Sequence, residues 1–262
     1  MSTTTAPPTT TRLERRNYGR NHGYRIDGAK VPGVTTVLGT LDKPALRNWY
    51  ARTAAERAVN EWDRLAELPI AERLSYIERG PRDVSRAAAL RGNEIHALGE
   101  KLVHGVEVAV PPEHYGPVEA YARWLDEWQI QTIATETPLA HTGYGYAGTA
   151  DLWAKVGVRD DAVCLLDVKT GKGVWNETGL QLAAYRYAEV MQPEKGVEIP
   201  VPAVELVYVA HVLPDTVRTL PVDASDAVFR DFLYLLQVWR AVQRWDEWPL
   251  IGAAVEAGGA DS

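Results

Sequence analysis

Residues 165–173 read L-L-D-V-K-T-G-K-G and place two charged side chains at the end of an apolar run. Residues two apart on a β-strand point to the same face of a sheet, so the carboxylate of Asp167 and the ammonium of Lys169 are predicted to project together. Such a pair suits metal-assisted phosphodiester hydrolysis, because a carboxylate ligates Mg²⁺ while a lysine stabilises charge on a reacting oxygen. Taken alone, a D-x-K pair is more commonly an exposed ion pair. The neighbouring motifs must therefore decide between an ion pair and a catalytic site.

The motif G-T-A-D at residues 148–151 lies on the preceding predicted strand, sixteen residues before Asp167. Two strands joined by a short loop can pair antiparallel, which would bring Asp151 beside Asp167. Two carboxylates at one spot repel each other unless a cation or a proton joins them. Asp151 alternatively belongs to a turn after Gly148, but the apolar L-W-A that follows argues against a simple turn. We therefore expect a divalent metal ion between the two carboxylates.

Two pairs of residues spaced four apart lie on the flanking helices. Gly92 and His96 share a helix face. Glycine inside a helix costs about 1 kcal/mol relative to alanine, so its use indicates a close approach by another backbone or by substrate. Gln181 and Tyr185 share a face of the helix predicted after Lys169, where an amide and a phenol suit contacts to phosphate or a base. A packed histidine and a half-buried helix face are the plainer alternatives for these two pairs.

Length and composition favour one large domain, or one domain with a subdomain, for the 262 residues. A single cysteine, Cys164, excludes a disulfide framework, a Cys₄ zinc site and a cysteine-ligated iron–sulfur cluster. No run approaches 18 apolar residues and the N-terminus lacks a secretory signal, so no membrane association is expected.

The charge is unevenly spread along the chain. Residues 1–104 carry 17 basic and 12 acidic side chains, whereas residues 105–262 carry 11 basic and 23 acidic, within a total of −7. This asymmetry is weak evidence that residues 1–104 bind a polyanionic partner. Arginine-rich helices that simply solvate their outer faces explain it as well.

Hydrophobic periodicity predicts an α/β protein with a helical first half and a strand-rich second half. Helices are predicted at residues 44–67, 71–79, 83–103, 113–129, 176–190 and 223–245, and strands at 132–139, 146–156, 162–169 and 203–213. Gly80-Pro81 is expected to close the second of these helices. A small hairpin is predicted over residues 24–31, and residues 34–38 fit either a strand or a capped helix start.

The ordered motifs G-x-x-x-H at 92–96, G-T-A-D at 148–151, D-V-K at 167–169 and Q-L-x-x-Y at 181–185 resemble the RecB-like branch of the PD-(D/E)XK nucleases. The segment P-G-V-T-T-V-L, followed by Trp49, is also similar to the opening of the mitochondrial genome maintenance exonuclease group. The resemblance implies a restriction-endonuclease-like core, a central mixed sheet flanked by helices, with a helical N-terminal region. The domains expected on this basis are a disordered segment 1–11, a helical DNA-guiding region 12–82, a nuclease core 83–250 and a flexible tail 251–262.

Matching motif by motif, the resemblance implies that Lys169 is catalytic and that Asp151 and Asp167 ligate Mg²⁺ or Mn²⁺. The further metal ligands that it implies are His96, the Val168 carbonyl and, less regularly, Glu136. Gln181 and Tyr185 are implied to orient the lysine or contact DNA. Basic side chains that could line the path of a strand are Arg47, Arg52, Arg57, Arg86, Arg91 and Lys172, the last of which equally fits an ordinary loop lysine.

Several relatives carry four cysteines around an iron–sulfur cluster, and this chain cannot. Its N-terminal helices are therefore expected to dock by hydrophobic packing, through Trp49 and Trp62.

The expected activity is a metal-dependent DNA exonuclease that leaves 5′-phosphates and serves recombination, replication or end processing. Its expected setting is the cytoplasm of a bacterial or phage-infected cell, with single-stranded or duplex DNA ends and a recombinase, helicase or single-strand-binding protein as partners. No nucleotide-binding P-loop is present, so a motor would be a separate protein. A catalytically silent DNA-binding subunit and a structure-specific endonuclease remain the alternatives.

Overall fold

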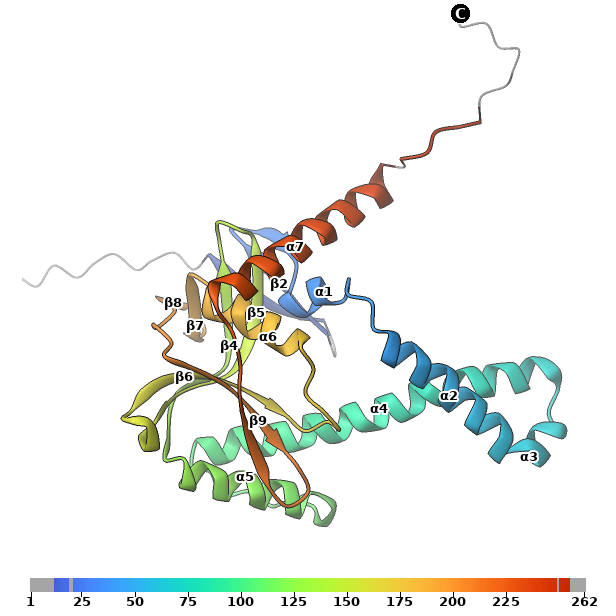
Figure 1. The fold of residues 1–262 in the computed structure, drawn as a ribbon, viewed down its shortest axis with the longest axis horizontal. Helices are drawn as coiled ribbons and strands as arrows, with labels where there is room; N and C mark the ends of the chain where they lie inside the picture. Colours follow the sequence, from blue (N-terminus) through green and yellow to red (C-terminus); the bar gives the residue numbers. More distant parts are fainter. Residues whose placement is uncertain (1–11, 19–20, 249, 255–262) are drawn as a thin grey trace, which may run out of the picture.

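The computed structural model describes residues 12–18, 21–248 and 250–254. A mixed seven-stranded sheet with the order β10-β9-β6-β5-β4-β7-β8 forms its centre (Figure 1). Its strands are β4 (Ile130–His141), β5 (Tyr146–Val156), β6 (Ala162–Lys169), β7 (Val190–Glu194), β8 (Val197–Pro200), β9 (Leu206–Val212) and β10 (Val217–Pro221). β6 and β9 run parallel and the other neighbouring pairs run antiparallel. The prediction of an α/β protein is confirmed in this form, a large mixed sheet flanked by helices.

Helices cover both faces of the sheet. The helices are α1 (Val34–Leu38), α2 (Pro44–Asn60), α3 (Trp62–Ala66), α4 (Ile70–Val103), α5 (Tyr115–Glu127), α6 (Glu177–Arg186) and α7 (Asp226–Glu247), with short 3₁₀ turns at Pro112–His114 and Gly157–Arg159. Alternate residues of β5 enter different cores: Trp153 packs with α1, α6 and α7, and Leu152 packs with α5. The central strands are therefore apolar on both sides, as a two-sided sheet requires.

A second, three-stranded sheet precedes the helices. It comprises β1 (Leu13–Tyr18), β2 (Asn21–Ile26) and β3 (Ala29–Val31). The predicted hairpin corresponds to β2 and β3, whose turn residues Asp27 and Gly28 have φ of 50° and 79°, the left-handed values that such a turn needs. The region 12–82 is thus part sheet and part helix, and residues 34–38 take the helical alternative as α1.

The chain does not break at Gly80-Pro81, which is a correction to the predicted separate helices. α4 is a single helix of 34 residues that contains Pro81, so the predicted boundary at 82/83 falls inside it. Pro81 removes one backbone hydrogen bond, but both residues are buried. A β-carbon on Gly80 would lie only 2.7 Å from Cδ of Arg57 on α2. Packing against α2 therefore stabilises the helix where its sequence disfavours it.

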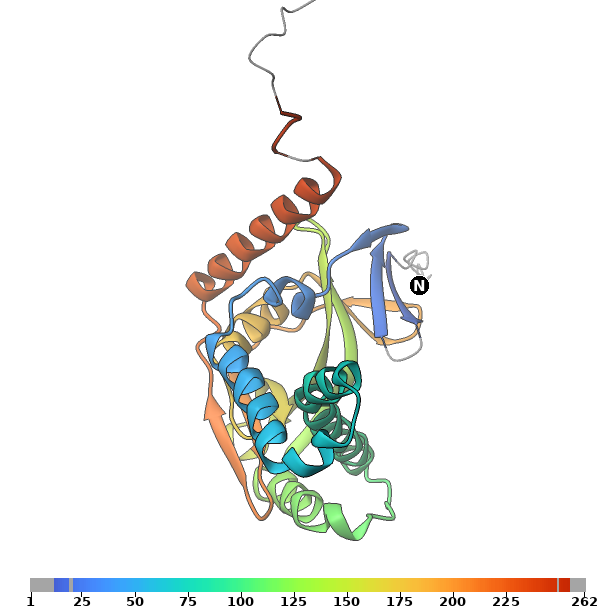
Figure 2. The same cartoon turned by 90° about the vertical axis from the view of Figure 1, so that its right-hand side faces the viewer.

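We call α2, α3 and the first half of α4 the helical arm, which extends away from the sheet (Figures 1 and 2). Trp62 does not dock it, contrary to expectation, because this side chain is 70% exposed. Arg57 joins the helices instead: its guanidinium lies 2.9 Å from Asp83 and stacks 4.0 Å from the ring centre of Tyr76.

The predicted strands correspond to β4, β5, β6 and β9, and the last three predicted helices to α5, α6 and α7. The predicted helix 176–190 is too long, because the chain leaves α6 after Arg186 and the Glu189 amide donates to the Ala140 carbonyl of β4. Strands β1, β7, β8 and β10 were not predicted. In the described part of the chain no helix could cross a membrane. The expectation of disorder at residues 1–11, and most of the expected tail at 251–262, lie outside the described residues.

Candidate active site

Strands β5 and β6 bring Asp151 and Asp167 to the same level of the sheet. Their antiparallel ladder ends with Leu152 opposite Leu166, so the next residues along the two strands are the two aspartates. Beyond this point the strands part, and the Asp151 carboxylate accepts the backbone N–H of Val168 at 2.8 Å. The predicted side-by-side arrangement is confirmed.

Glu136 extends this row onto β4. Its neighbours Thr135 and Thr137 are both in register with β5, and that register puts Glu136 level with Asp151. Glu136 has φ of 44°, a left-handed conformation that costs a residue with a β-carbon of the order of 1 kcal/mol. β4 is therefore distorted at Glu136. The Glu136 carboxylate contacts the site at this point, because its Oε1 lies 3.6 Å from Nδ1 of His96.

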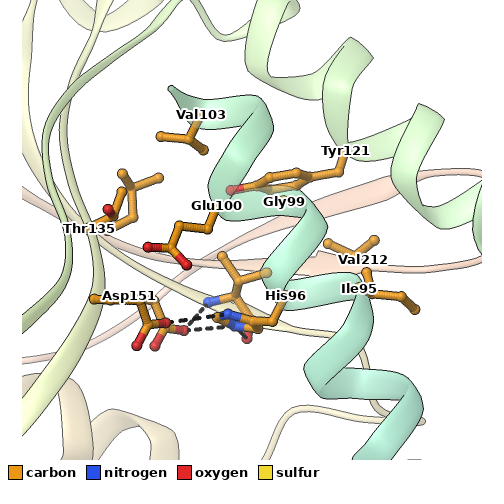
Figure 3. A pocket seen from close by; sticks show the side chains of 12 residues that line it. Ile95, His96, Gly99, Glu100, Val103, Tyr121, Thr135, Asp151 and Val212 are labelled. Atoms are coloured by element: carbon orange, nitrogen blue, oxygen red, sulfur yellow. Dashed lines mark hydrogen bonds and ion pairs between the residues drawn. The ribbon is translucent and has the colours of Figure 1, made fainter. Parts of the chain in front are cut away.

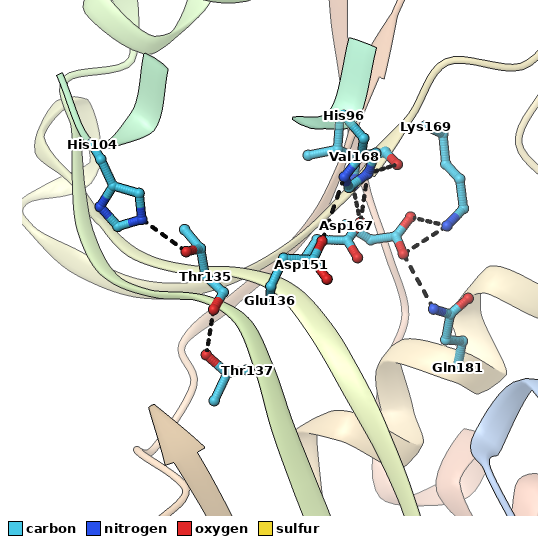
Figure 4. A network of polar contacts seen from close by, with 10 residues as sticks. All are labelled: His96, His104, Thr135, Glu136, Thr137, Asp151, Asp167, Val168, Lys169 and Gln181. Carbon is cyan, nitrogen blue, oxygen red and sulfur yellow. Dashed lines mark hydrogen bonds and ion pairs between the residues drawn. The ribbon is translucent and has the colours of Figure 1, made fainter. Parts of the chain in front are cut away.

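His96 reaches this row from α4 on the adjoining face (Figures 3 and 4). Its Nε2 lies 3.2 Å from Oδ2 of Asp151 and 3.1 Å from the Val168 carbonyl oxygen. Burial lowers the pKa of His96, but the hydrogen bonds to Asp151 and Glu136 outweigh burial and raise the pKa to about 11. The same contacts lower the pKa of Asp151 against the opposing effect of its own burial. In this arrangement His96 is an imidazolium between carboxylates.

A small cavity of about 20 Å³ lies behind His96 and is lined by Tyr121 and Glu100 among others (Figure 3). It has room for about one water molecule. Gly92 stands one turn before His96, and a β-carbon there would lie 3.0 Å from the Thr170 hydroxyl. A close approach at Gly92 was expected from another backbone or from substrate, but the atom that approaches belongs to a side chain of the loop after β6.

Asp167 is the most buried charge of the site, at 1% exposure. Lys169 Nζ donates to Oδ1 at 2.7 Å and lies 2.6 Å from Oδ2, and Gln181 Nε2 donates to Oδ1 at 3.3 Å (Figure 4). Burial raises the pKa of Asp167 to about 6, with the negative charge of Asp151 adding to the effect and Lys169 opposing it. Although Oδ2 of Asp167 lies close to Lys169 Nζ, the two atoms are not aligned for a hydrogen bond, and Oδ2 accepts none from the other described residues.

Gln181 and Tyr185 orient the carboxylate rather than the lysine. Gln181 contacts Asp167 and also donates to the Tyr185 hydroxyl at 3.2 Å. The Tyr185 ring is 3% exposed and packs directly on Gly148, where a β-carbon would lie 2.4 Å from it. The glycine of the G-T-A-D motif therefore makes room for this ring.

The basic residues predicted to contact DNA do not converge on the carboxylates. Arg91 on α4 and Lys172 in the loop after β6 are exposed. In the arm, Arg47 pairs with Asp42 at 2.9 Å and Arg52 with Glu56 at 2.7 Å. Such exposed pairs contribute little to stability.

The two carboxylates fit a hard divalent cation. Among the described residues no group of three or more His, Cys, Asp or Glu side chains is arranged around one point. Mg²⁺ commonly uses only one or two carboxylates and completes its octahedron with waters and substrate phosphates. Asp151, Asp167 and the Val168 carbonyl supply such oxygen donors. The imidazole of His96 would have to lose its proton before it could join them.

Arg15 is a residue of this region that the sequence did not single out. With Glu136 it lines two cavities, of about 200 Å³ and about 480 Å³, that adjoin the site. The alternation of L-E-R on β1, with an arginine two residues after a core leucine, is the signal that would have revealed it.

No protein-family model matches this chain, and no curated protein matches it. A solved structure titled "Crystal structure of SSO0001" aligns with 80% of this chain and 82% of its own length, at 14% identity and a TM-score of 0.31. A superposition at that score does not establish a shared fold.

Proposed function

We propose that the chain is a Mg²⁺- or Mn²⁺-dependent DNA exonuclease with a RecB-like PD-(D/E)XK core. The observation that carries the proposal is the group formed by Asp151, Asp167 and Lys169 where β5 and β6 part. A buried carboxylate, a second carboxylate on the next strand and a lysine within 2.7 Å match the needs of phosphodiester hydrolysis.

Asp151 and Asp167 would hold the metal ion, with the Val168 carbonyl as a further oxygen donor. When bound, the ion lowers the pKa of water and polarises a phosphate oxygen. Lys169 hydrogen-bonds to the attacking water and offsets charge that develops on the phosphate. Gln181 keeps Asp167 in place through its hydrogen bond at 3.3 Å. Once neutral, His96 would support a second metal position.

The helical arm supports a strand-guiding role. α4 runs from the arm to the site without interruption, so Arg86, Arg91 and His96 share one helix. Phosphates that follow the helix would be led to the carboxylates. A free end is the natural entry for such a strand, which favours an exonuclease over the endonuclease alternative.

The test is digestion of end-labelled single-stranded and duplex DNA by the purified chain, with Mg²⁺, Mn²⁺ or EDTA. We expect metal-dependent release of nucleotides with 5′-phosphates, and a loss of about 10²–10³ in rate for Lys169→Ala. Lys195→Ala, in the exposed turn between β7 and β8, is the matched control and retains activity. Cleavage in EDTA, or full activity of Lys169→Ala, would refute the mechanism.

Two outcomes lead to the alternatives. Degradation of covalently closed circular DNA indicates an endonuclease. Metal-independent DNA binding without any cleavage indicates a silent DNA-binding subunit, and a recombinase, helicase or single-strand-binding protein would then be sought as its partner.

A further inference from the structure

Among the described side chains on the face of β1 and β2 that packs on the central sheet, one is charged. β1 pairs antiparallel with β2, so Leu13 lies opposite Ile26 and Arg15 lies opposite Tyr24. Opposite residues of such a pair share a face. Leu13, Tyr24 and Ile26 are 1%, 4% and 7% exposed. Arg15 therefore occupies a position that the pattern reserves for a core residue.

Arg15 receives no compensation for this position from the described part of the chain. Its Nε is buried without a hydrogen-bond partner, and no described carboxylate lies within 4.0 Å of its guanidinium. Its neighbours differ, since Arg16 pairs with Glu14 at 2.8 Å and Arg12 is bound to Asp27. Burying an N–H without a hydrogen-bond partner destabilises the folded protein. A ligand that accepts hydrogen bonds would offset that cost.

The cavities next to Arg15 lead into the proposed active site. The cavity of about 200 Å³ is lined by Arg15, Tyr24, Asp151, Gln181 and others, so the guanidinium and a metal-binding carboxylate border one space. Since about 10–15 Å³ of such volume holds one water, this space admits a phosphate group together with waters. Arg15 also borders the cavity of about 480 Å³ that is lined by His96. An anion at Arg15 would thus lie beside the carboxylates without entering their row.

β1 is held firmly enough to present the guanidinium at a defined place. The Leu13 amide donates to Glu198 at 2.5 Å, and Gln192 donates to the Leu13 carbonyl at 3.3 Å. The Tyr24 hydroxyl shares a hydrogen bond of 2.8 Å with Thr149 on β5. These contacts bind the small sheet to β8, β7 and β5. Arg15 is two residues from Leu13 and opposite Tyr24.

We propose that Arg15 forms a phosphate-binding subsite that holds the phosphodiester group adjacent to the scissile one. The guanidinium offers paired N–H donors that match phosphate oxygens. The subsite rests on the proposed nuclease function for the identity of the scissile phosphate, while its affinity for a nucleic-acid phosphate stands on Arg15 alone. Arg15 is a positioning residue here, because it touches a phosphate that does not react.

The test is a binding measurement on full-length protein carrying Lys169→Ala, with a fluorescent single-stranded oligonucleotide followed by anisotropy. Adding Arg15→Gln is expected to weaken binding about tenfold and to reduce the slope of log K against log salt by about one. Arg16→Gln removes a charge one residue away on the opposite face of β1 and is expected to change binding less than about twofold. Arg15→Lys should restore the salt slope without restoring full affinity.

A second measurement identifies the phosphate. Single linkages of the oligonucleotide are replaced in turn by an uncharged methylphosphonate. One replacement should weaken binding to the Arg15 protein and leave the Arg15→Gln protein unaffected, which is the coupling that a direct contact produces. Arg15→Met supplies a second neutral side chain in case Arg15→Gln does not fold, as checked by circular dichroism.

The two proposals fail differently. Equal affinities of Arg15→Gln and Arg16→Gln, or equal sensitivity to every methylphosphonate with and without Arg15, would overturn the subsite even if the wild-type chain cleaves DNA. If Arg15 and one linkage are coupled in the binding measurement while the wild-type chain never cleaves DNA, the subsite is supported and the nuclease function is refuted.

Discussion

At the scale of single residues, the spacing of charges on one strand was enough to predict the pair formed by Asp167 and Lys169. Their distance of 2.7 Å follows from a two-residue repeat that any strand imposes. The contacts of His96 were harder to predict from the sequence, because its partners Asp151 and Val168 lie on two other elements. The motifs placed it on a helix, and only packing of α4 on the sheet brings it to the carboxylates.

Gly148 tests how tightly the site is packed. Gly148→Ala would place a β-carbon 2.4 Å from the buried Tyr185 ring. We expect a loss of about 1–3 kcal/mol in the free energy of unfolding, as overpacking of a core typically costs. Urea denaturation measures it. Gly171→Ala is the control, because its nearest neighbour would lie at 3.9 Å; equal losses in both variants would contradict the contact.

Displacement of Tyr185 has a consequence for the chemistry. Its hydroxyl accepts from Gln181, which in turn donates to Asp167. Gly148→Ala should therefore also lower the rate of DNA cleavage, whereas Gly171→Ala should lower it less.

At the scale of elements, α4 shows why a local signal can mislead. Gly80-Pro81 is a typical helix stop, yet α4 continues because α2 packs against it at that point. The strands β7, β8 and β10 were missed for a related reason. Each is four or five residues long and lies towards an edge of the sheet, so partner strands rather than periodicity establish it.

The hairpin of β4 and β5 has a turn that is capped by a side chain from elsewhere in the chain. The Glu189 carboxylate accepts the Thr142 amide at 2.7 Å, the Gly143 amide at 3.3 Å and the Thr142 hydroxyl. Partial burial raises the pKa of Glu189, but these hydrogen bonds outweigh burial and lower it below its ordinary value of 4.5. A lowered folded-state pKa stabilises the protein above the unfolded pKa and ceases to do so as the pH falls through the folded one.

Glu189→Gln should therefore destabilise the protein at neutral pH, by less than about 1 kcal/mol because the carboxylate is partly exposed. The difference from the wild type should shrink as the pH falls below 4.5. Thermal denaturation over a pH series measures this. Glu107→Gln, in an exposed loop, provides the comparison without such a cap. A difference that grew towards low pH would have the wrong sign.

At the scale of the whole molecule, metal binding and folding should be linked. A ligand that binds only the folded state at 100 times its Kd adds about 2.7 kcal/mol to stability. A protein of this size gains about 2–4 °C in Tm per kcal/mol. We expect Mn²⁺ to raise the Tm of the wild-type chain by several degrees, and EDTA to reverse the rise.

Asp151→Asn and Asp167→Asn should each lose most of that rise, whatever their Tm without metal. Asp126→Asn, on the exposed side of α5, should keep it. An equal rise in the three variants would place the metal elsewhere on the molecule.

Local patterns in the chain were sufficient for the class of fold and for the chemistry-bearing motifs, because each motif spans at most five residues and strand or helix geometry alone aligns its side chains. Local patterns did not predict how these motifs assemble into one site. Glu136, Asp151 and Asp167 meet through the register of three strands. Arg15 borders the same cavity as Glu136 and Asp151, on a strand whose Leu13 is hydrogen-bonded to Glu198, 185 residues away. Contacts over such separations arise from burial of apolar faces that many elements share, so they follow from the folded chain and not from any one segment.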